Sequence, residues 1–140
     1  MIDNNEIPKK GLISDGSYQK SKKLIQWRVM NIETGEFVWE NGLYSETPYI
    51  HNLAEYFGIV KCIKYCIDND LNLVCYTDSM TSLSWLNSGV NTSITNPKLL
   101  KLVKAGEQYI KFAKEYLNYP KVEKWLSSDW GENLSDYGFK

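Results

Sequence analysis

The stretch Leu71-Asn-Leu-Val-Cys-Tyr-Thr-Asp78 decides the class of fold. Residues 71–76 form an apolar run that is interrupted only by Asn72, and the stretch ends at a carboxylate. Continuous apolar runs of this kind are typical of a central strand that is covered on both faces of its sheet. We therefore expect a buried strand over residues 71–76, with helices packed on the sheet.

Helical patterns stand on both sides of this strand. Before it, apolar residues recur at helical spacing over residues 52–67. After it, a short helix is expected over residues 79–86 and a longer one over residues 97–117, because the proline at residue 97 is tolerated in a first helical turn. Gly106 lies on the expected buried stripe of the longer helix, which predicts a close approach to another element.

Strand patterns occupy the beginning and the end of the chain. Residues 24–30 alternate between apolar and polar side chains, and a second strand begins at residues 37–39, so the two should form a hairpin. A first strand over residues 11–15 and a last one over residues 122–126 give the order βββαβααβ. This order predicts a single α/β domain over residues 1–140, with a five-stranded mixed sheet flanked by helices.

The composition is that of an ordinary globular domain, with 43% hydrophobic and 24% charged residues. A net charge of -1 argues against coating nucleic acid by bulk charge, although a local basic patch is compatible with it. The start of the chain lacks the apolar region of a signal peptide, and no stretch approaches the roughly 18 apolar residues of a membrane span. Three cysteines fit a reducing compartment, so we expect a cytoplasmic protein. We also expect a monomer that is not bound to a membrane.

The single histidine, His51, excludes several kinds of chemistry. The chain has no histidine pair for zinc, no spare histidine for a Ser-His-Asp triad and no Gly-rich phosphate loop. The cysteines, Cys62, Cys66 and Cys75, have apolar neighbours and are expected to be small buried hydrophobic residues. If the chain is an enzyme, carboxylates must perform most of its chemistry.

Four acidic residues stand where an acid is costly. Asp15 and Asp78 end predicted strands, Glu55 lies near the sheet-facing side of the first helix, and Asp136 follows the last strand. A carboxylate at an apolar border costs free energy unless it is paired, and clustered like charges repel one another. A divalent cation would resolve both problems.

Each of these acids also has an ordinary explanation. Asp78 could cap the following helix, and Asp15 could be a turn residue. Glu55 could interact with the dipole of its helix, and Asp136 competes with two other acids of the same tail. Singly, these residues therefore carry little information.

Together, four segments resemble the motifs of a known family. They are Ile13-Ser-Asp-Gly-Ser17, His51-Asn-Leu-Ala-Glu55, Tyr76-Thr-Asp-Ser79 and Trp130-Gly-Glu-Asn-Leu-Ser-Asp-Tyr-Gly138. Their order and contexts resemble those of ribonuclease H, and the tail and residues 81–86 look like its Bacteroides-associated bacterial and phage branch. The resemblance covers nearly the whole chain and implies the RNase H-like fold.

The resemblance also implies an activity, which is the metal-dependent hydrolysis of the RNA strand of an RNA–DNA hybrid with 5′-phosphate products. Asp15, Glu55, Asp78 and Asp136 match the four acidic positions of the family, one by one. They would hold two Mg²⁺ ions, with Mn²⁺ as the other candidate. One ion would activate the attacking water and the other would stabilise the leaving 3′ oxygen.

Residues beside these acids and lysines of the long helix are the candidates for substrate binding, and the resemblance supports Asn52 among them. Asn52 matches a family asparagine that contacts the minor groove, where 2′-hydroxyls distinguish RNA from DNA. Lysines on one face of the long helix could contact phosphates or could be ordinary solvated residues. The full set expected to bind the hybrid is Asn52, Gly16, Ser17, Ser79, Lys101 and Lys104.

The sequence departs from the family pattern at two places. Residues 18–23, Tyr-Gln-Lys-Ser-Lys-Lys, replace a Gly-Asn-Pro-Gly turn of many members, so the first hairpin should be rebuilt. No histidine lies between Trp125 and Asp136, where many members carry one, and His51 is not its positional equivalent. Two alternatives follow, a non-catalytic nucleic-acid-binding module on the same fold and a related nuclease with another substrate.

Overall fold

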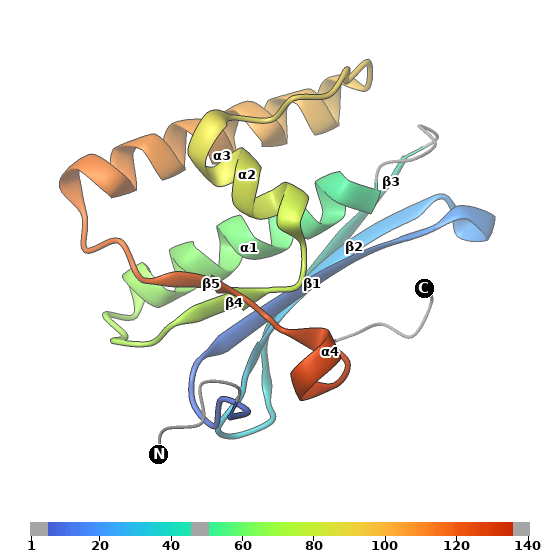
Figure 1. The fold of residues 1–140 in the computed structure, drawn as a ribbon. Coiled ribbons are helices and arrows are strands. Elements are labelled where there is room, and N and C mark those ends of the chain that lie inside the picture. The colour runs from blue at the N-terminus through green and yellow to red at the C-terminus, as the bar shows by residue number, and fades with distance from the viewer. Residues whose placement is uncertain (1–5, 46–50, 136–140) are drawn as a thin grey trace.

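The computed structural model describes residues 6–45 and 51–135 (Figure 1). The elements in chain order are β1 (Leu12–Gln19), a 3₁₀ turn (Lys20–Lys22), β2 (Leu24–Asn31), β3 (Phe37–Tyr44), α1 (His51–Asp68), β4 (Cys75–Thr77), α2 (Met80–Ser88), α3 (Pro97–Tyr116), β5 (Val122–Lys124) and α4 (Ser127–Trp130). The strands form one sheet in the order β3-β2-β1-β4-β5. The pairs β1–β2 and β2–β3 are antiparallel, and β1–β4 and β4–β5 are parallel. The predicted mixed five-stranded sheet is therefore confirmed.

The three longer helices cover one face of the sheet, with α1 against the sheet and α3 outermost (Figure 1). The core between them buries residues that the helical and strand patterns place inward, among them Val29, Ile59, Ile63 and Leu99, each at 0% exposure. Burying a side chain of this size stabilises the fold by about 1.5–3 kcal/mol. This face of the molecule is therefore held by ordinary hydrophobic packing.

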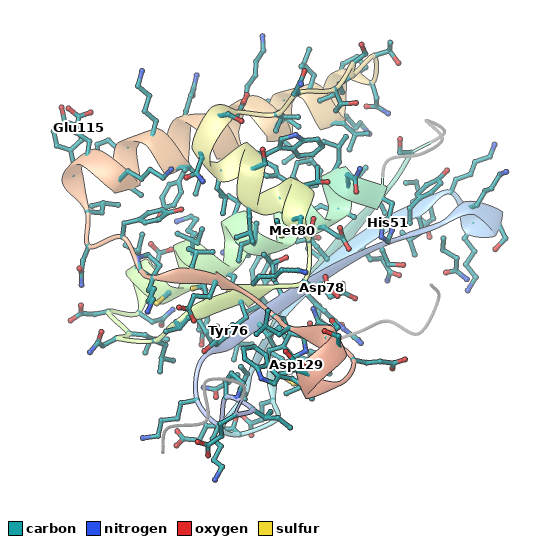
Figure 2. All side chains as sticks on the ribbon, in the orientation of Figure 1. His51, Tyr76, Asp78, Met80, Glu115 and Asp129 are labelled. Carbon is teal, nitrogen blue, oxygen red and sulfur yellow. The ribbon has the colours of Figure 1, made fainter. Side chains whose placement is uncertain are left out.

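α3 begins where the sequence predicts. The Asn96 side chain accepts hydrogen bonds from the backbone nitrogens of Lys98 and Leu99, and Pro97 occupies the first turn, where its missing N–H costs nothing. The C-terminal end of α3, marked by Glu115 in Figure 2, lies far from His51 in that view. Among the described residues, no helix is long and apolar enough to cross a membrane.

The three cysteines are buried, Cys62 and Cys66 on α1 and Cys75 on β4, as predicted. Hydrogen bonding to Cys75 and burial raise the pKa of the Cys66 thiol, and hydrogen bonding to Cys62 likewise raises the pKa of Cys75. Cys66 and Cys75 therefore stay protonated, and all three cysteines serve as small core residues.

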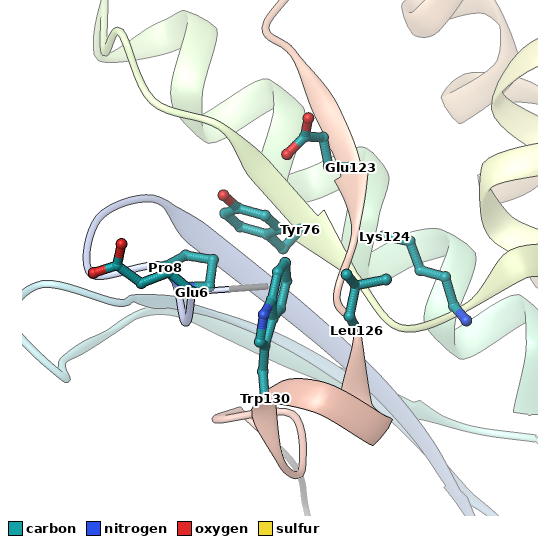
Figure 3. Close-up of a pocket in the computed structure, with 7 residues that line it drawn as sticks. All are labelled: Glu6, Pro8, Tyr76, Glu123, Lys124, Leu126 and Trp130. Carbon is teal, nitrogen blue, oxygen red and sulfur yellow. The ribbon is translucent and has the colours of Figure 1, made fainter. Parts of the chain in front are cut away.

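The opposite face of the sheet carries a smaller, aromatic cluster. Tyr76 and Trp130 each pack edge-on against Trp125, with ring centroids 5.8 Å and 5.0 Å away respectively. The Trp125 side chain is fully buried, and its Nε1 donates a hydrogen bond to the carbonyl oxygen of Gly131 at 3.0 Å. A pocket of about 580 Å³ lies beside the cluster, lined in part by Tyr76, Glu123 and Trp130 (Figure 3). Burial raises the pKa of Tyr76, and the charge of Glu123 raises it further.

Four details differ from the sequence prediction. The strand predicted over residues 71–76 covers Cys75–Thr77, because its neighbours β1 and β5 pair with it from Cys75 onward. β1 runs past residue 15 to Gln19, and α4 was not predicted. A Cβ on Gly106 would meet its nearest atoms, on Tyr56 and Val60, at 3.6 Å. That is ordinary contact, so the expected close approach at Gly106 was wrong.

Candidate metal site

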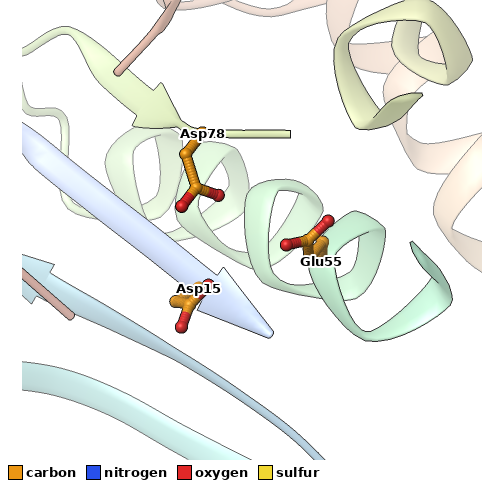
Figure 4. Close-up of side chains that lie close together, drawn as sticks. All are labelled: Asp15, Glu55 and Asp78. Atoms are coloured by element: carbon orange, nitrogen blue, oxygen red, sulfur yellow. The ribbon is translucent and has the colours of Figure 1, made fainter. Parts of the chain in front are cut away.

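Three carboxylates from distant parts of the chain converge beside the inner strands β1 and β4 (Figure 4). Asp15 lies on β1, Glu55 on α1 and Asp78 just after β4, and each offers an oxygen within 4.8 Å of the other two. Asp15 is 1% exposed and Glu55 is 9% exposed, whereas Asp78 is half-buried. Three of the four predicted acidic residues are thus brought together.

The parallel pairing of β1 with β4 brings the two aspartates side by side. In this ladder Ile13 pairs with Tyr76. Each aspartate follows two residues later on its own strand, so continuing the register places Asp15 beside Asp78. Asp78 does not cap α2, because the Ser79 side chain accepts the capping hydrogen bond from the backbone nitrogen of Ser82 at 3.0 Å.

Two glycines bring the glutamate to the aspartates. A Cβ on Gly16 would overlap the backbone of Ala54 and Glu55, so only glycine allows α1 to touch β1 here. A Cβ on Gly58 would lie 3.0 Å from the carbonyl oxygen of Asp15, which is also tight. These contacts fix Glu55 next to Asp15.

The site has the donor chemistry of a hard divalent cation. Three carboxylates within 4.8 Å of one another would repel by about 3 kcal/mol or more per pair if all were charged, at an effective dielectric constant near 20. Carboxylate oxygens are the ligands that Mg²⁺ prefers, and a bound cation would offset the repulsion. The residues present therefore fit a metal ion.

His51 is a neighbour of the site that the sequence analysis set aside. It is the first residue of α1, and its Nε2 lies 3.3 Å from Oε1 of Glu55. The signal in the sequence was the spacing of four residues, which puts both side chains on one face of a helix. His51 is therefore placed to orient the Glu55 carboxylate.

The chain that leads to Asp136 is held next to the site by hydrogen bonds. Asn133 Nδ2 donates to the carbonyl oxygen of Ser14 at 2.9 Å, and Arg28 Nε donates to the carbonyl oxygen of Ser135 at 2.8 Å. Asn133 Oδ1 accepts from the nitrogen and the hydroxyl of Ser135, at 2.8 Å and 2.6 Å. Asn133 and Ser135 are buried. Asp136 itself lies outside the described residues.

The other residues predicted to bind substrate are placed unequally. Asn52 is exposed in the first turn of α1, and Lys101 and Lys104 are exposed on α3. Gly16 packs against α1, Ser17 is 1% exposed and Ser79 is 6% exposed. Contact of any of these residues with a hybrid stays a prediction. Exposure is compatible with that role for Asn52 and the two lysines.

The sequence matches no model of a known protein family. Among solved structures, the RNase H domain of prototype foamy virus shares 14% identity with a TM-score of 0.53, over 84% of this chain and 79% of that one. LC11-RNase H1, isolated from compost by a metagenomic approach, shares 16% identity with a TM-score of 0.52, over 84% of each chain. The chain therefore has the ribonuclease H fold. Its membership of the ribonuclease H family, and of the Bacteroides-associated branch, stays a prediction.

Proposed function

We propose that the chain is a metal-dependent endonuclease that hydrolyses the RNA strand of RNA–DNA hybrids. The observation that carries this proposal is the convergence of Asp15, Glu55 and Asp78 on the ribonuclease H fold. Three acids within 4.8 Å of one another repel when charged, and a bound divalent cation would offset that repulsion.

The three carboxylates have the role of metal ligands in this proposal. Asp15, Glu55 and Asp78 would hold the ions through carboxylate oxygens, and the buried backbone around Asp15 keeps them in register. Two Mg²⁺ ions, or Mn²⁺ in their place, would supply Lewis acidity at the scissile phosphate when bound. Fixing the carboxylates before the substrate arrives avoids reorganisation during the reaction.

Asp136 is proposed as the fourth acidic ligand. The support is indirect and lies in the preceding residues, since Asn133 is hydrogen-bonded to the residue before Asp15 and Ser135 is hydrogen-bonded to Arg28. Arg28 is the register partner of Asp15 in the first hairpin. Ser135, the residue before Asp136, is therefore held next to the site.

A nuclease assay with Asp78→Asn tests the proposal. A labelled RNA–DNA hybrid is incubated with wild type or variant in Mg²⁺, Mn²⁺ or EDTA, and the strands are separated on a denaturing gel. Asp78→Asn should abolish cleavage and leave the fold intact, because it removes a ligand charge without a change of size. Asp129→Asn, at an exposed acid of α4, is the matched control and should cleave like wild type.

Each outcome of this assay has a meaning. Cleavage of the RNA strand by wild type and by Asp129→Asn, dependent on metal, supports the proposal. Undiminished cleavage by Asp78→Asn would contradict the metal site. Tight binding of the hybrid without cleavage in either metal would favour a non-catalytic nucleic-acid-binding module, and cleavage of other nucleic acids alone would favour a related nuclease.

The substrate contacts of α3 have a separate test. Lys101→Glu combined with Lys104→Glu should weaken hybrid binding and reduce the slope of log K against log salt by about two, one for each lost phosphate contact. Fluorescence anisotropy over a salt series measures this slope. Lys9→Glu combined with Lys10→Glu, at two exposed lysines near the start of the chain, makes the same charge change. Equal slopes in the two double variants would return Lys101 and Lys104 to ordinary solvated residues.

A further inference from the structure

α3 carries a second apolar stripe that the described part of the chain covers only partly, at Tyr109. Its buried stripe faces the core and consists of Leu99, Val103, Gly106, Ile110 and Ala113. The second, which we call the outer stripe, consists of Leu102, Ala105, Tyr109, Phe112 and Tyr116. Leu102 is 36% exposed, Phe112 is 51% exposed and Tyr116 is 67% exposed. Large apolar side chains aligned in this way on the outermost helix (Figure 1) are typical of an interaction surface.

The spacing of the outer stripe is that of a coiled-coil seam. Its members follow one another at intervals of three, four, three and four residues. This is the a/d pattern of two heptads, which presents one apolar line to a single facing helix. An apolar groove of about 250 Å³ runs beside the seam between α1 and α3, lined in part by Phe57, Val60 and Leu102. The surface is therefore shaped for a helix.

We propose that the facing helix is α3 of a second copy of this chain, packed antiparallel across a two-fold axis near Tyr109. In that arrangement Ala105 lies opposite Phe112 of the second copy, so a small residue faces a large one. Leu102 lies opposite Tyr116 of the second copy, and the two Tyr109 residues meet at the axis. The stripe is thus complementary to itself when reversed.

The charges along the edge of the seam select the antiparallel direction. Lys101, Gln108 and Glu115 follow the seam at intervals of seven residues, and all three are exposed. An antiparallel second copy brings Lys101 to Glu115 twice and Gln108 to its own counterpart. In a parallel copy the same residues would lie on opposite sides of the seam, so Lys101 and Glu115 would form no pair. Figure 2 shows Glu115 at the end of α3, pointing away from the body of the molecule.

The contact is short, so the dimer should be weak. Residues 102–116 of one helix span about 21 Å at 1.5 Å per residue. An interface of this length belongs to the small class, for which we expect a Kd of about 1–100 μM. The sequence analysis expected a monomer. Here the exposed stripe argues for a concentration-dependent dimer. The inference does not require nuclease activity, but the second copy and a bound hybrid would compete for Lys101.

Sedimentation equilibrium of the metal-free protein without nucleic acid, from about 1 to 200 μM, tests the dimer. Leu102 and Leu100 form a matched pair, since they are 36% and 37% exposed on the same helix and only Leu102 lies on the outer stripe. Leu102→Asp should raise the Kd at least about tenfold, whereas Leu100→Asp should leave it unchanged. Circular dichroism confirms that each variant is folded. A wild type that stays monomeric throughout, or an equal loss in both variants, overturns the proposal.

A charge exchange tests the direction of the two helices. Lys101→Glu alone should weaken the dimer about tenfold, because it turns two attractive pairs into repulsive ones. Adding Glu115→Lys restores the pairs with their signs exchanged and should return the Kd to near the wild-type value. Failure of the double variant to recover overturns the antiparallel arrangement.

Discussion

The two faces of the sheet are built by different means. The helical face has a broad apolar core under α1, α2 and α3, which ordinary periodic stripes supply. The opposite face has a cluster of four buried residues in the described chain, which are Ile13, Met30, Tyr76 and Trp125. That face is completed by α4 and by hydrogen bonds from the tail.

The candidate site lies where the two faces meet. Glu55 comes from the helical layer, whereas Asp15 shares the side of β1 that carries Ile13, because side chains alternate along a strand. Glu55 can approach the two aspartates only because Gly16 lets α1 touch β1. A large core therefore makes the fold stable, while a few close contacts at its border make the site.

The largest effect is expected at the contact between the faces. Gly16→Ala forces a methyl group into the backbone of α1 and should lower the free energy of unfolding by about 3 kcal/mol or more. Urea unfolding measures this loss. Gly106→Ala is the matched control, since its Cβ meets only ordinary contacts at 3.6 Å in a helix, where alanine is favoured over glycine by about 1 kcal/mol.

The outcome at these two glycines decides whether close approach or mere burial matters. Both are buried, so a rule based on burial alone predicts equal losses. Unchanged stability in Gly16→Ala would mean that α1 can move away from β1. In that case the affinity for Mg²⁺, measured by calorimetry, should fall with the displacement of Glu55.

The aromatic cluster should give an effect of similar size. Trp125→Ala should cost about 3–4 kcal/mol, as for other buried aromatic residues, although its cluster is small. Trp85→Ala, on the helical face at 8% exposure, should cost a similar amount. The two differ in a second measurement, because Trp125 also holds Gly131 at the start of the tail. Only Trp125→Ala should weaken Mg²⁺ binding, and equal affinities in both variants would contradict a role for this face in the site.

The sequence predicted the helical face better than the opposite one. Periodic stripes identify α1 and α3, and the alternation of residues 24–30 identifies β2, because each pattern reflects a face that packs on the core. The strand at residues 71–76 was predicted too long because an apolar run shows burial and not strand pairing. α4 has four residues, which is too short to show any period.

The site was predictable only in part, for a related reason. Asp15, Glu55 and Asp78 each stand at a border that the local pattern marks, and the resemblance grouped them. Arg28 and Asn133 carry no local signal, since their partners Ser135 and Ser14 lie 107 and 119 residues away in the chain. Contacts at such a distance appear only when the fold brings the segments together.

The smallest of these effects tests the tail directly. Asn133→Ala removes the hydrogen bond to Ser14 and both bonds from Ser135, and should cost about 1–2 kcal/mol of stability. The same substitution should also lower the affinity for Mg²⁺ about tenfold, as for residues that position metal ligands.

Ser135→Ala is the control for this variant, because it removes a single hydroxyl and leaves the link from Asn133 to Ser14 in place. Calorimetry of Mg²⁺ binding compares the two variants. If Asn133→Ala loses stability but keeps its affinity for the ion, the tail braces the sheet without positioning a ligand. In that case the border between the faces would act through three carboxylates alone, without Asp136.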